Sequence, residues 1–250
     1  MIKRIFKNII LKTLSLNNYK LTKNLEFPPE ANEEIKKFIK LSLQYSMTSS
    51  ERMYLLSEAV LNIKNQKIEG DFVECGVWMG GNILLYNLLN EFYNLNKSIY
   101  GYDTFEGMTD PESVDVDIQN NSAENLMKEE KKTENQRGVH CYSKIDTVKN
   151  NILQHSNLNN INLIQGPVEK TLLLEKNIPD KISILRLDTD FFASTKIELE
   201  VLYPILVSGG VLIIDDYGHW KEQRKAIDDY FGKKKWLHIV DYSCRYLIKN

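Results

Sequence analysis

Long apolar runs, paired cysteines and an excess of charge of one sign are all missing from this sequence of 250 residues. No apolar run approaches the roughly 20 residues that a membrane-spanning helix needs, so we expect no integral membrane span. The formal net charge of −2 gives no electrostatic reason for binding nucleic acid. The three cysteines form no CxxC pair and their odd number argues against a disulfide framework, so we expect a cytoplasmic protein.

Two familiar nucleotide-binding patterns are also absent, the phosphate loop GxxxxGK[ST] and the dinucleotide fingerprint GxGxxG. No internal repeat or Gly/Ser/Pro-rich linker divides the chain, and its length suits one large α/β domain better than two. With 42% hydrophobic and 26% charged residues, the composition is that of an ordinary globular domain.

Short apolar runs alternate with helix-like stretches from residue 71 onward, which predicts a mostly parallel sheet with helices on both faces. The expected strands are Asp71–Cys75, Ser98–Tyr102, Ile161–Gln165, Ile182–Leu187 and Val211–Ile214. The expected helices are Ile83–Tyr93, Lys144–Gln154 and Thr195–Leu206. Two further strand-like runs, Trp236–Asp241 and Cys244–Ile248, are separated by two residues and predict an antiparallel hairpin. Such a hairpin at the sheet edge is typical of methyltransferases that use S-adenosylmethionine (AdoMet).

The first 68 residues read as a helical extension for lid or oligomer contacts, and residues 69–250 as the α/β domain. Ser49-Ser50-Glu51-Arg52 is a typical start for a helix through Met53–Ile63. Residues 1–24 combine six basic residues with apolar ones and have no acid, which fits a helix on an anionic membrane surface. The alternative, a helix that packs on its own domain or on a second subunit, is the one we favour.

Residues 106–138 are polar and acidic and show little periodicity. They follow the second predicted strand, at the edge of the sheet where α/β proteins bind ligands. A long loop at this place predicts a lid that closes over the substrate. The alternative is a surface insertion with a short helix around Ser122–Lys131.

A glycine-containing turn between the first predicted strand and its helix is the expected cofactor site, because glycine lets a ligand approach the backbone closely. Asp103 ends the second strand, 27 positions after Gly76, where an acid can bind both ribose hydroxyls of a nucleoside. A ligand with adenosine but no pyrophosphate, such as AdoMet, fits this combination. Glu74 either pairs with the charged amino-acid end of the cofactor or orients the turn. The turn residues predicted to bind the cofactor are Glu74, Gly76, Trp78, Gly80 and Gly81.

Four aspartates end the fourth and fifth predicted strands, namely Asp188, Asp190, Asp215 and Asp216. The carboxyl ends of parallel strands meet at one edge, so we expect these acids to converge there. No lysine adjoins them, and their repulsion is costly unless a cation or protons intervene. We expect a bound cation, and oxygen ligands without Cys or His favour Mg²⁺, Mn²⁺ or Ca²⁺ over zinc. Such an ion makes a hydroxyl more acidic, and a nearby carboxylate or, alternatively, His219 then takes the proton.

These motifs, in this order, resemble the macrocin O-methyltransferase (TylF-type) family, whose members methylate sugar hydroxyls of macrolide and aminocoumarin antibiotics. The resemblance covers roughly residues 45–231. It rests on GDFVECGVWMGG at 70–81, YGYDTFEG at 100–107, LRLDTD at 185–190, SGGVLIIDDYGHW at 208–220 and RKAIDDYF at 224–231. It implies a class I AdoMet-methyltransferase fold, which is a Rossmann-like, doubly wound and mostly parallel seven-stranded sheet, with AdoMet and Mg²⁺ as cofactors.

The resemblance also implies roles for individual residues. Asp190 is the general base, and Met47 contacts the cofactor from the N-terminal helices. A homo-oligomer is implied as well, with those helices at the interface. The implied metal ligands are Asp188, Asp215 and Asp216. The implied adenosine contacts are Asp103, Thr104 and Phe105.

The expected function is therefore metal-dependent transfer of a methyl group from AdoMet to a hydroxyl of a small, sugar-containing acceptor. One alternative is an O-methyltransferase that acts on a non-sugar, catechol-like acceptor. The other is a non-catalytic AdoMet-binding subunit of a glycan assembly complex. Four converging acids argue against the second alternative, because a scaffold does not need them.

Overall fold

The computed structural model describes residues 27–111, 115–232 and 235–250. The helix predicted within residues 1–24 lies outside these ranges. Phe27–Ala31, the described end of the first segment, contain a turn in which Ala31 N donates to Pro28 O at 3.1 Å. Asn32–Asn250 form one compact unit. The part of the predicted extension that follows Ala31 therefore folds in the same unit as the sheet.

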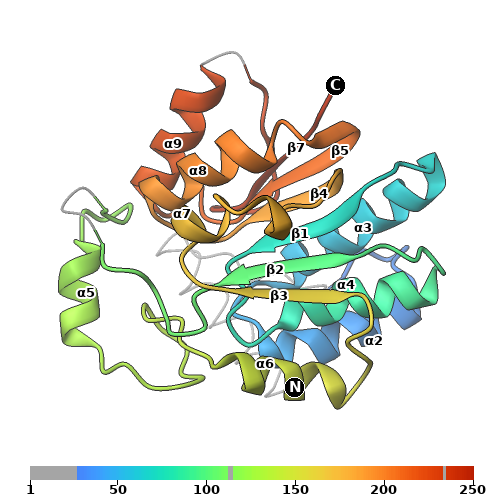
Figure 1. The fold of residues 1–250 in the computed structure, drawn as a ribbon, viewed down its shortest axis with the longest axis horizontal. Helices are drawn as coiled ribbons and strands as arrows, with labels where there is room; N and C mark the ends of the chain where they lie inside the picture. The colour runs from blue at the N-terminus through green and yellow to red at the C-terminus, as the bar shows by residue number, and fades with distance from the viewer. Residues whose placement is uncertain (1–26, 112–114, 233–234) are drawn as a thin grey trace, which may run out of the picture. The chain divides into compact units, whose positions relative to one another are not determined.

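The described strands form a seven-stranded sheet with the order β3-β2-β1-β4-β5-β7-β6. Figure 1 shows β3, β2, β1 and β4 side by side in this order. Strands β1 to β5 run parallel, whereas β7 lies antiparallel between β5 and β6. The predicted α/β class, with a mostly parallel sheet and an antiparallel C-terminal hairpin, is confirmed. The strands are β1 (Asp71–Cys75), β2 (Ile99–Asp103), β3 (Ile161–Gln165), β4 (Ile182–Leu187), β5 (Leu206–Ile214), β6 (His238–Ile239) and β7 (Arg245–Ile248).

Helices cover both faces of this sheet (Figure 1). On one face pack α3 (Ser50–Gln66) and α4 (Gly81–Phe92), with α2 (Glu33–Ser42) against α4. On the other face pack α7 (Val168–Thr171) and α8 (Phe192–Leu202), with α9 (Lys221–Phe231) against α8. The remaining described helices are η1 (Leu43–Tyr45), α5 (Ala123–Glu129), α6 (Ile145–Leu153) and η2 (Glu175–Asn177). Within the described ranges, none of the helices has the length and apolar character needed to cross a bilayer.

The central strand β4 is buried along its whole length. This is expected of a parallel strand that helices cover on both faces. Leu185 of β4 packs in one apolar cluster with Val73 of β1, Leu212 of β5 and Leu199 of α8. Arg186 in the same strand is only 2% exposed, so its charge needs partners inside the protein.

Several element boundaries differ from the sequence-based predictions. Strand β5 begins at Leu206 instead of Val211, and α8 ends at Leu202. Gly209 adopts a φ of +79°, and the pairing of β4 with β5 shifts register after Ile182. Such an irregularity lets the strand start earlier than its apolar run. The C-terminal hairpin, in contrast, is shorter than predicted, because β6 contains only His238–Ile239.

Candidate active site

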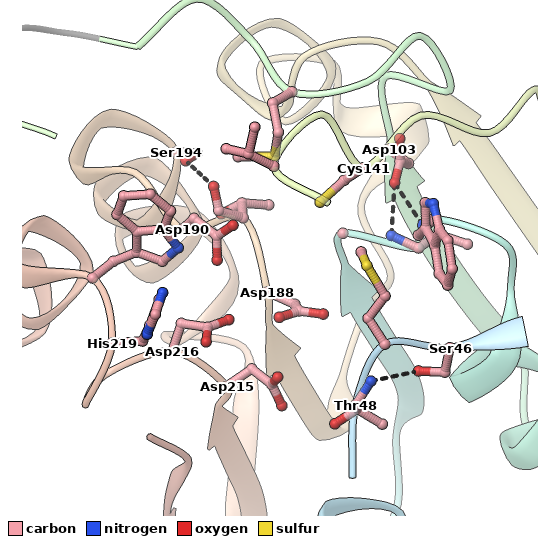
Figure 2. A pocket seen from close by; sticks show the side chains of 18 of the residues that line it. Ser46, Thr48, Asp103, Cys141, Asp188, Asp190, Ser194, Asp215, Asp216 and His219 are labelled. Atoms are coloured by element: carbon pink, nitrogen blue, oxygen red, sulfur yellow. Dashed lines mark hydrogen bonds between the residues drawn. The ribbon is translucent and has the colours of Figure 1, made fainter. Parts of the chain in front are cut away.

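A cavity of about 790 Å³ lies at the carboxyl ends of β1, β2, β4 and β5. This volume is typical of sites for small molecules and cofactors. Its lining comes from the strand ends, from the segment Ser46–Arg52 and from the loop after β2. Figure 2 shows the aspartates of β4 and β5 across the cavity from Asp103. The cavity therefore opens at the sheet edge where ligands of α/β proteins bind.

The turn after β1 exposes its backbone to this cavity, which Gly76, Val77 and Trp78 line. Gly76 adopts a φ of +88°, and a Cβ there would lie 2.1 Å from Asp188 O. Only glycine fits such a position. The turn of β1 and the end of β4 therefore approach each other as closely as two backbones can.

Gly80 and Gly81, also predicted to contact the cofactor, are not among the described residues that line the cavity. A Cβ on Gly81 would lie 2.6 Å from Ser42 O and 2.7 Å from Ser46 Cβ. Gly80 has a φ of +89° and lies against Val148 of α6. These glycines are thus needed for packing, and Gly81 in particular lets the chain before α3 lie on the start of α4.

Asp103, predicted to bind ribose, ties the glycine turn to the next loop. Its Oδ2 accepts hydrogen bonds from Val77 N at 2.7 Å and from Trp78 N at 3.0 Å. Its Oδ1 accepts from Phe105 N at 2.7 Å. Burial raises the pKa of Asp103, and these amides counteract part of that effect. Ribose binding would use the lone pairs that remain on these oxygens, and it stays a prediction.

The other predicted adenosine contacts lie in different surroundings. Thr104 and Met47 line the cavity, and Met47 is 37% exposed. Phe105 is 1% exposed and is not among the described lining residues. The buried ring of Phe105 anchors the start of the loop after β2. Its predicted contact with the cofactor stays a prediction.

Glu74 lies beneath the cavity and not on its wall. Its Oε1 accepts a hydrogen bond from Asn82 Nδ2 at 2.8 Å and lies 2.6 Å from Arg186 Nη1. Burial raises the pKa of Glu74 to about 7. Of the two roles that the sequence left open, these contacts favour orientation of the turn, because Asn82 follows it directly in α4.

Three aspartates meet where β4 and β5 end. Carboxylate oxygens of Asp188, Asp215 and Asp216 lie within 4.8 Å of one another (Figure 2). Sheet register brings them together, because Leu187 pairs with Ile214 and each precedes one of these acids. A donor set of carboxylate oxygens suits Mg²⁺ or Mn²⁺, so these residues fit the predicted ion.

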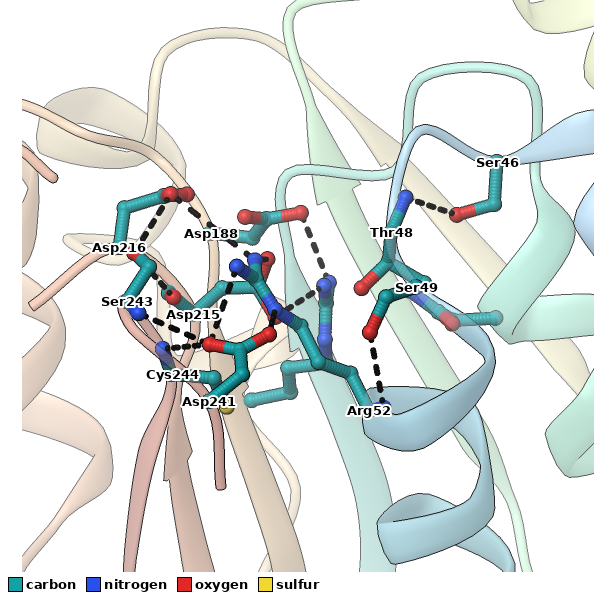
Figure 3. Close-up of polar contacts among 12 residues, drawn as sticks. Ser46, Thr48, Ser49, Arg52, Asp188, Asp215, Asp216, Asp241, Ser243 and Cys244 are labelled. Carbon is teal, nitrogen blue, oxygen red and sulfur yellow. Dashed lines mark hydrogen bonds and ion pairs between the residues drawn. The ribbon is translucent and has the colours of Figure 1, made fainter. Parts of the chain in front are cut away.

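Two arginines also reach these acids, so positive side chains of the protein relieve part of the repulsion that the sequence predicts. Arg186 places Nη1 2.8 Å from Asp188 Oδ2 and Nη2 2.7 Å from Asp215 Oδ1. Arg52 of α3 places Nη1 2.5 Å from Asp215 Oδ2 and Nε 2.7 Å from Asp241 Oδ2 (Figure 3). Burial opposes these charges, yet the carboxylates raise the pKa of both arginines.

Carboxyl groups still outnumber the two arginines at the ends of β4 and β5. Burial raises the pKa of Glu74, Asp188 and Asp190, so either protons or a divalent cation can relieve the repulsion among these groups. The carboxyl groups that surround the two guanidinium groups are those of Glu74, Asp188, Asp190, Asp215, Asp216 and Asp241.

Asp190 and His219 are the two candidate bases, and both line the cavity. Burial, together with the charge of Asp216 beside it, raises the pKa of Asp190 well above the ordinary value. His219 Nδ1 has no hydrogen-bond partner within the described ranges, and its ring packs edge-on to Trp220 at 5.4 Å. The contact with Asp216 puts Asp190 directly beside the predicted ion ligands, which favours Asp190.

Comparisons with known proteins agree with this geometry. The family model described as Macrocin-O-methyltransferase (TylF) matches residues 2–249. The chain belongs to this family. As a macrocin-O-methyltransferase family member it is an O-methyltransferase, and the predicted family is confirmed.

Two curated relatives of this family member come from Streptomyces. The 8-demethyl-8-(2,3-dimethoxy-alpha-L-rhamnosyl)-tetracenomycin-C 4'-O-methyltransferase of Streptomyces olivaceus is 30% identical over 77% of this chain and 69% of the relative. The demethyldecarbamoylnovobiocin O-methyltransferase of Streptomyces niveus is 26% identical over 76% and 68%. The solved O-methyltransferase NovP has a similar fold, with a TM-score of 0.72 at 20% identity over 86% of this chain and 98% of NovP.

Sequence reasoning assigned no role to Arg52, Arg186 or Asp241 of this macrocin-O-methyltransferase family member. Arg186 carried a signal, because a charged residue inside an apolar strand must be paired when the strand is buried. Arg52 and Asp241 carried none. They are 189 positions apart and meet only in the folded chain.

Proposed function

We propose that this enzyme transfers a methyl group from AdoMet to a hydroxyl of a sugar-containing acceptor, with Mg²⁺ or Mn²⁺ held by Asp188, Asp215 and Asp216. The observation that carries the proposal is the convergence of these three aspartates in the cavity that the Gly76 turn lines. A sugar acceptor is supported by the relatives, one of which is named for a rhamnosyl-tetracenomycin. The assembly of a homo-oligomer and a cytoplasmic location stay predictions.

The donor would lie between the backbone of the Gly76 turn and the side chains of Met47 and Thr104. All of these line one continuous cavity. A methyl group can move from a sulfonium to an oxygen only if the two are held in line, so binding both ligands in one cavity supplies much of the rate. Asp103 contributes by fixing the turn through its bonds to Val77 N and Trp78 N.

Proton removal is the chemical role that the chain itself provides. When bound, the divalent ion supplies Lewis acidity that makes an alcohol a better nucleophile. Asp190 accepts the hydroxyl proton on a carboxylate oxygen while the hydroxyl oxygen forms its bond to the methyl carbon. The bond between the methyl carbon and the sulfur of AdoMet breaks in the same step, and S-adenosylhomocysteine leaves with the electron pair on its sulfur. Burial and Asp216 raise the pKa of Asp190, which makes its carboxylate a stronger base than an exposed one.

The loop after β2 supports the proposed lid. Met108, Leu126 of α5 and Val139 line the cavity from this loop. The short helix that formed part of the alternative, a surface insertion, is also present as α5, but its Leu126 lines the cavity. Apolar side chains from such a loop exclude water from the reaction, so we propose that this segment covers the acceptor.

A labelled-methyl assay with AdoMet and a panel of glycosides, nucleotide sugars and catechols tests the proposal. We expect transfer to a sugar hydroxyl, loss of transfer with a chelator, and recovery on addition of Mg²⁺. Asp216→Asn should lower the rate by about 10²-fold or more, because it removes an ion ligand. Asp146→Asn, which changes an acid that is 87% exposed on α6, is the matched control and should leave the rate unchanged.

Transfer that persists in the chelator would contradict the ion's role, and transfer only to catechols would contradict the sugar acceptor. AdoMet binding without transfer to any acceptor class would favour the non-catalytic subunit instead.

A further inference from the structure

We propose that Arg52 is an internal counter-ion that a divalent cation displaces from Asp215, so that ion binding loosens the Ser46–Arg52 segment of the cavity wall. Arg52 is a positioning residue in this scheme, because it acts through Asp215. The inference rests on the proposed ion site at Asp188, Asp215 and Asp216.

Both carboxylate oxygens of Asp215 face a guanidinium group. Arg186 Nη2 lies 2.7 Å from Oδ1, and Arg52 Nη1 lies 2.5 Å from Oδ2 (Figure 3). Asp215 is 5% exposed, so water screens these charges little. An ion that binds Asp215 therefore comes within a few ångströms of a positive side chain, and repulsion weakens the contact of one arginine.

Of the two arginines, Arg52 is the one whose contact with Asp215 breaks more easily. Arg186 is the second-to-last residue of the central strand β4, is 3% exposed, and contacts Glu74 and Asp188 in addition to Asp215. Arg52 lies in the first turn of α3, outside the sheet. Besides Asp215, it pairs with Asp241 and, more distantly at 4.0 Å, with the proposed ion ligand Asp216.

Asp241 remains an ion-pair partner for Arg52 after the contact between Arg52 and Asp215 breaks. Arg52 Nε lies 2.7 Å from Asp241 Oδ2, and Nη2 donates to Oδ1 at 3.3 Å. Asp241 is itself fixed, because its Oδ1 accepts from the backbone N of Ser243 at 2.8 Å and of Cys244 at 2.7 Å. The guanidinium can therefore give up Asp215 and remain in a forked pair with Asp241.

The backbone around Arg52 connects this exchange to the cofactor side of the cavity. Arg52 N donates to Ser49 Oγ at 3.3 Å, which is the N-cap contact of α3. Met47, Thr48 and Ser49 line the cavity. The Asp215 contact therefore holds one end of a wall segment, and the segment is less restrained once an ion has taken Asp215.

Titration of Mn²⁺ followed by electron paramagnetic resonance tests the competition without relying on catalysis. We expect Arg52→Gln to lower the Kd for Mn²⁺ by about tenfold, because it removes a positive charge that adjoins an ion ligand. Lys64→Gln is the matched control, since it removes the same charge from an exposed position of the same helix. It should leave the Kd unchanged, and circular dichroism checks that each variant is folded.

Unchanged or weaker Mn²⁺ binding in folded Arg52→Gln would overturn the inference. Weaker binding would show that Arg52 orients Asp215 for the ion instead. In that case Mn²⁺ still binds the unmodified enzyme, so the proposed function stands. Absence of Mn²⁺ binding to the unmodified enzyme would overturn both.

Hydrogen exchange provides a second measurement. Addition of Mg²⁺ should speed exchange at least about twofold in a peptide that covers Ser46–Met53 of the unmodified enzyme, because a restraint on this segment is lost. The same peptide of Arg52→Gln should exchange equally fast with and without Mg²⁺. Unaltered or slower exchange in the unmodified enzyme at saturating Mg²⁺ would contradict the proposed loosening.

Discussion

Arg186 and Glu74 form an ion pair inside the sheet, with Nη1 2.6 Å from Oε1 and side chains that are 3% and 1% exposed. The same guanidinium group contacts Asp188 and Asp215 at the end of the strands. One buried arginine thus holds together the floor of the cofactor turn and two proposed ion ligands. Removal of one partner from such a cluster leaves charges buried without compensation, which is costly.

Arg186→Met should therefore lower the free energy of unfolding by about 3–5 kcal/mol. Urea denaturation of the purified variant measures this change. Lys181→Met is the matched control, because Lys181 pairs with Glu69 on the surface, where both side chains are more than half exposed. Such exposed pairs contribute about 0–1 kcal/mol. A loss below about 1 kcal/mol for Arg186→Met would show that the remaining carboxyl groups relax or take up protons readily, so that the cluster does not depend on its arginine.

The pH dependence of the free energy of unfolding should reveal the raised pKa of Glu74. Burial raises its pKa from 4.5 to about 7, so the native chain holds the proton more tightly than the unfolded chain does. This contribution to stability is fully present below pH 4.5 and is lost as the pH rises through about 7. The free energy of unfolding of the unmodified enzyme should accordingly fall relative to that of Glu74→Gln over this interval. Urea denaturation at several pH values measures both, and a difference that is constant with pH would contradict the shift.

Gly76→Ala should disable the cofactor turn. The new Cβ would meet Asp188 O at 2.1 Å, and the φ of +88° is unfavourable for alanine. We expect a loss of about 2–4 kcal/mol in stability and weaker AdoMet binding by calorimetry. Gly232→Ala separates the two causes, because Gly232 also has a positive φ of +65° but no atom lies within 4 Å of its Cβ position. If both variants lose the same stability, backbone strain and not the close approach decides the position.

Asp190→Asn and His219→Ala together identify the base. Asp190→Asn keeps the shape of the side chain but removes its ability to take a proton, so kcat should fall by about 10²–10⁴-fold. His219→Ala should lower kcat by less than about tenfold, because His219 then only lines the cavity. Steady-state kinetics at saturating AdoMet and Mg²⁺ measures both. The reverse order of the two effects would assign the proton transfer to His219.

The sequence by itself determined the strands and the acids at their ends. Strands β1, β3 and β4 have the bounds that their apolar runs predicted. Strand identity follows from local composition, and the geometry of a parallel sheet then brings Asp188 and Asp215 to one edge. A short run of apolar residues was sufficient to predict each of these strands, because a strand that is buried on both faces consists almost entirely of apolar residues.

Only the tertiary structure decided how those acids are paired and which backbones touch. Arg52 and Asp215 are 163 positions apart, and no local pattern relates a helix start to the end of a distant strand. The same holds for Gly81, whose need for glycine comes from Ser42 on another segment. Oδ2 of Asp103 likewise accepts hydrogen bonds from the amides of Val77 and Trp78, on a segment about 25 positions away. Side-chain direction and the approach of remote segments depend on how the whole core packs, and that information is not present in any short stretch of the chain.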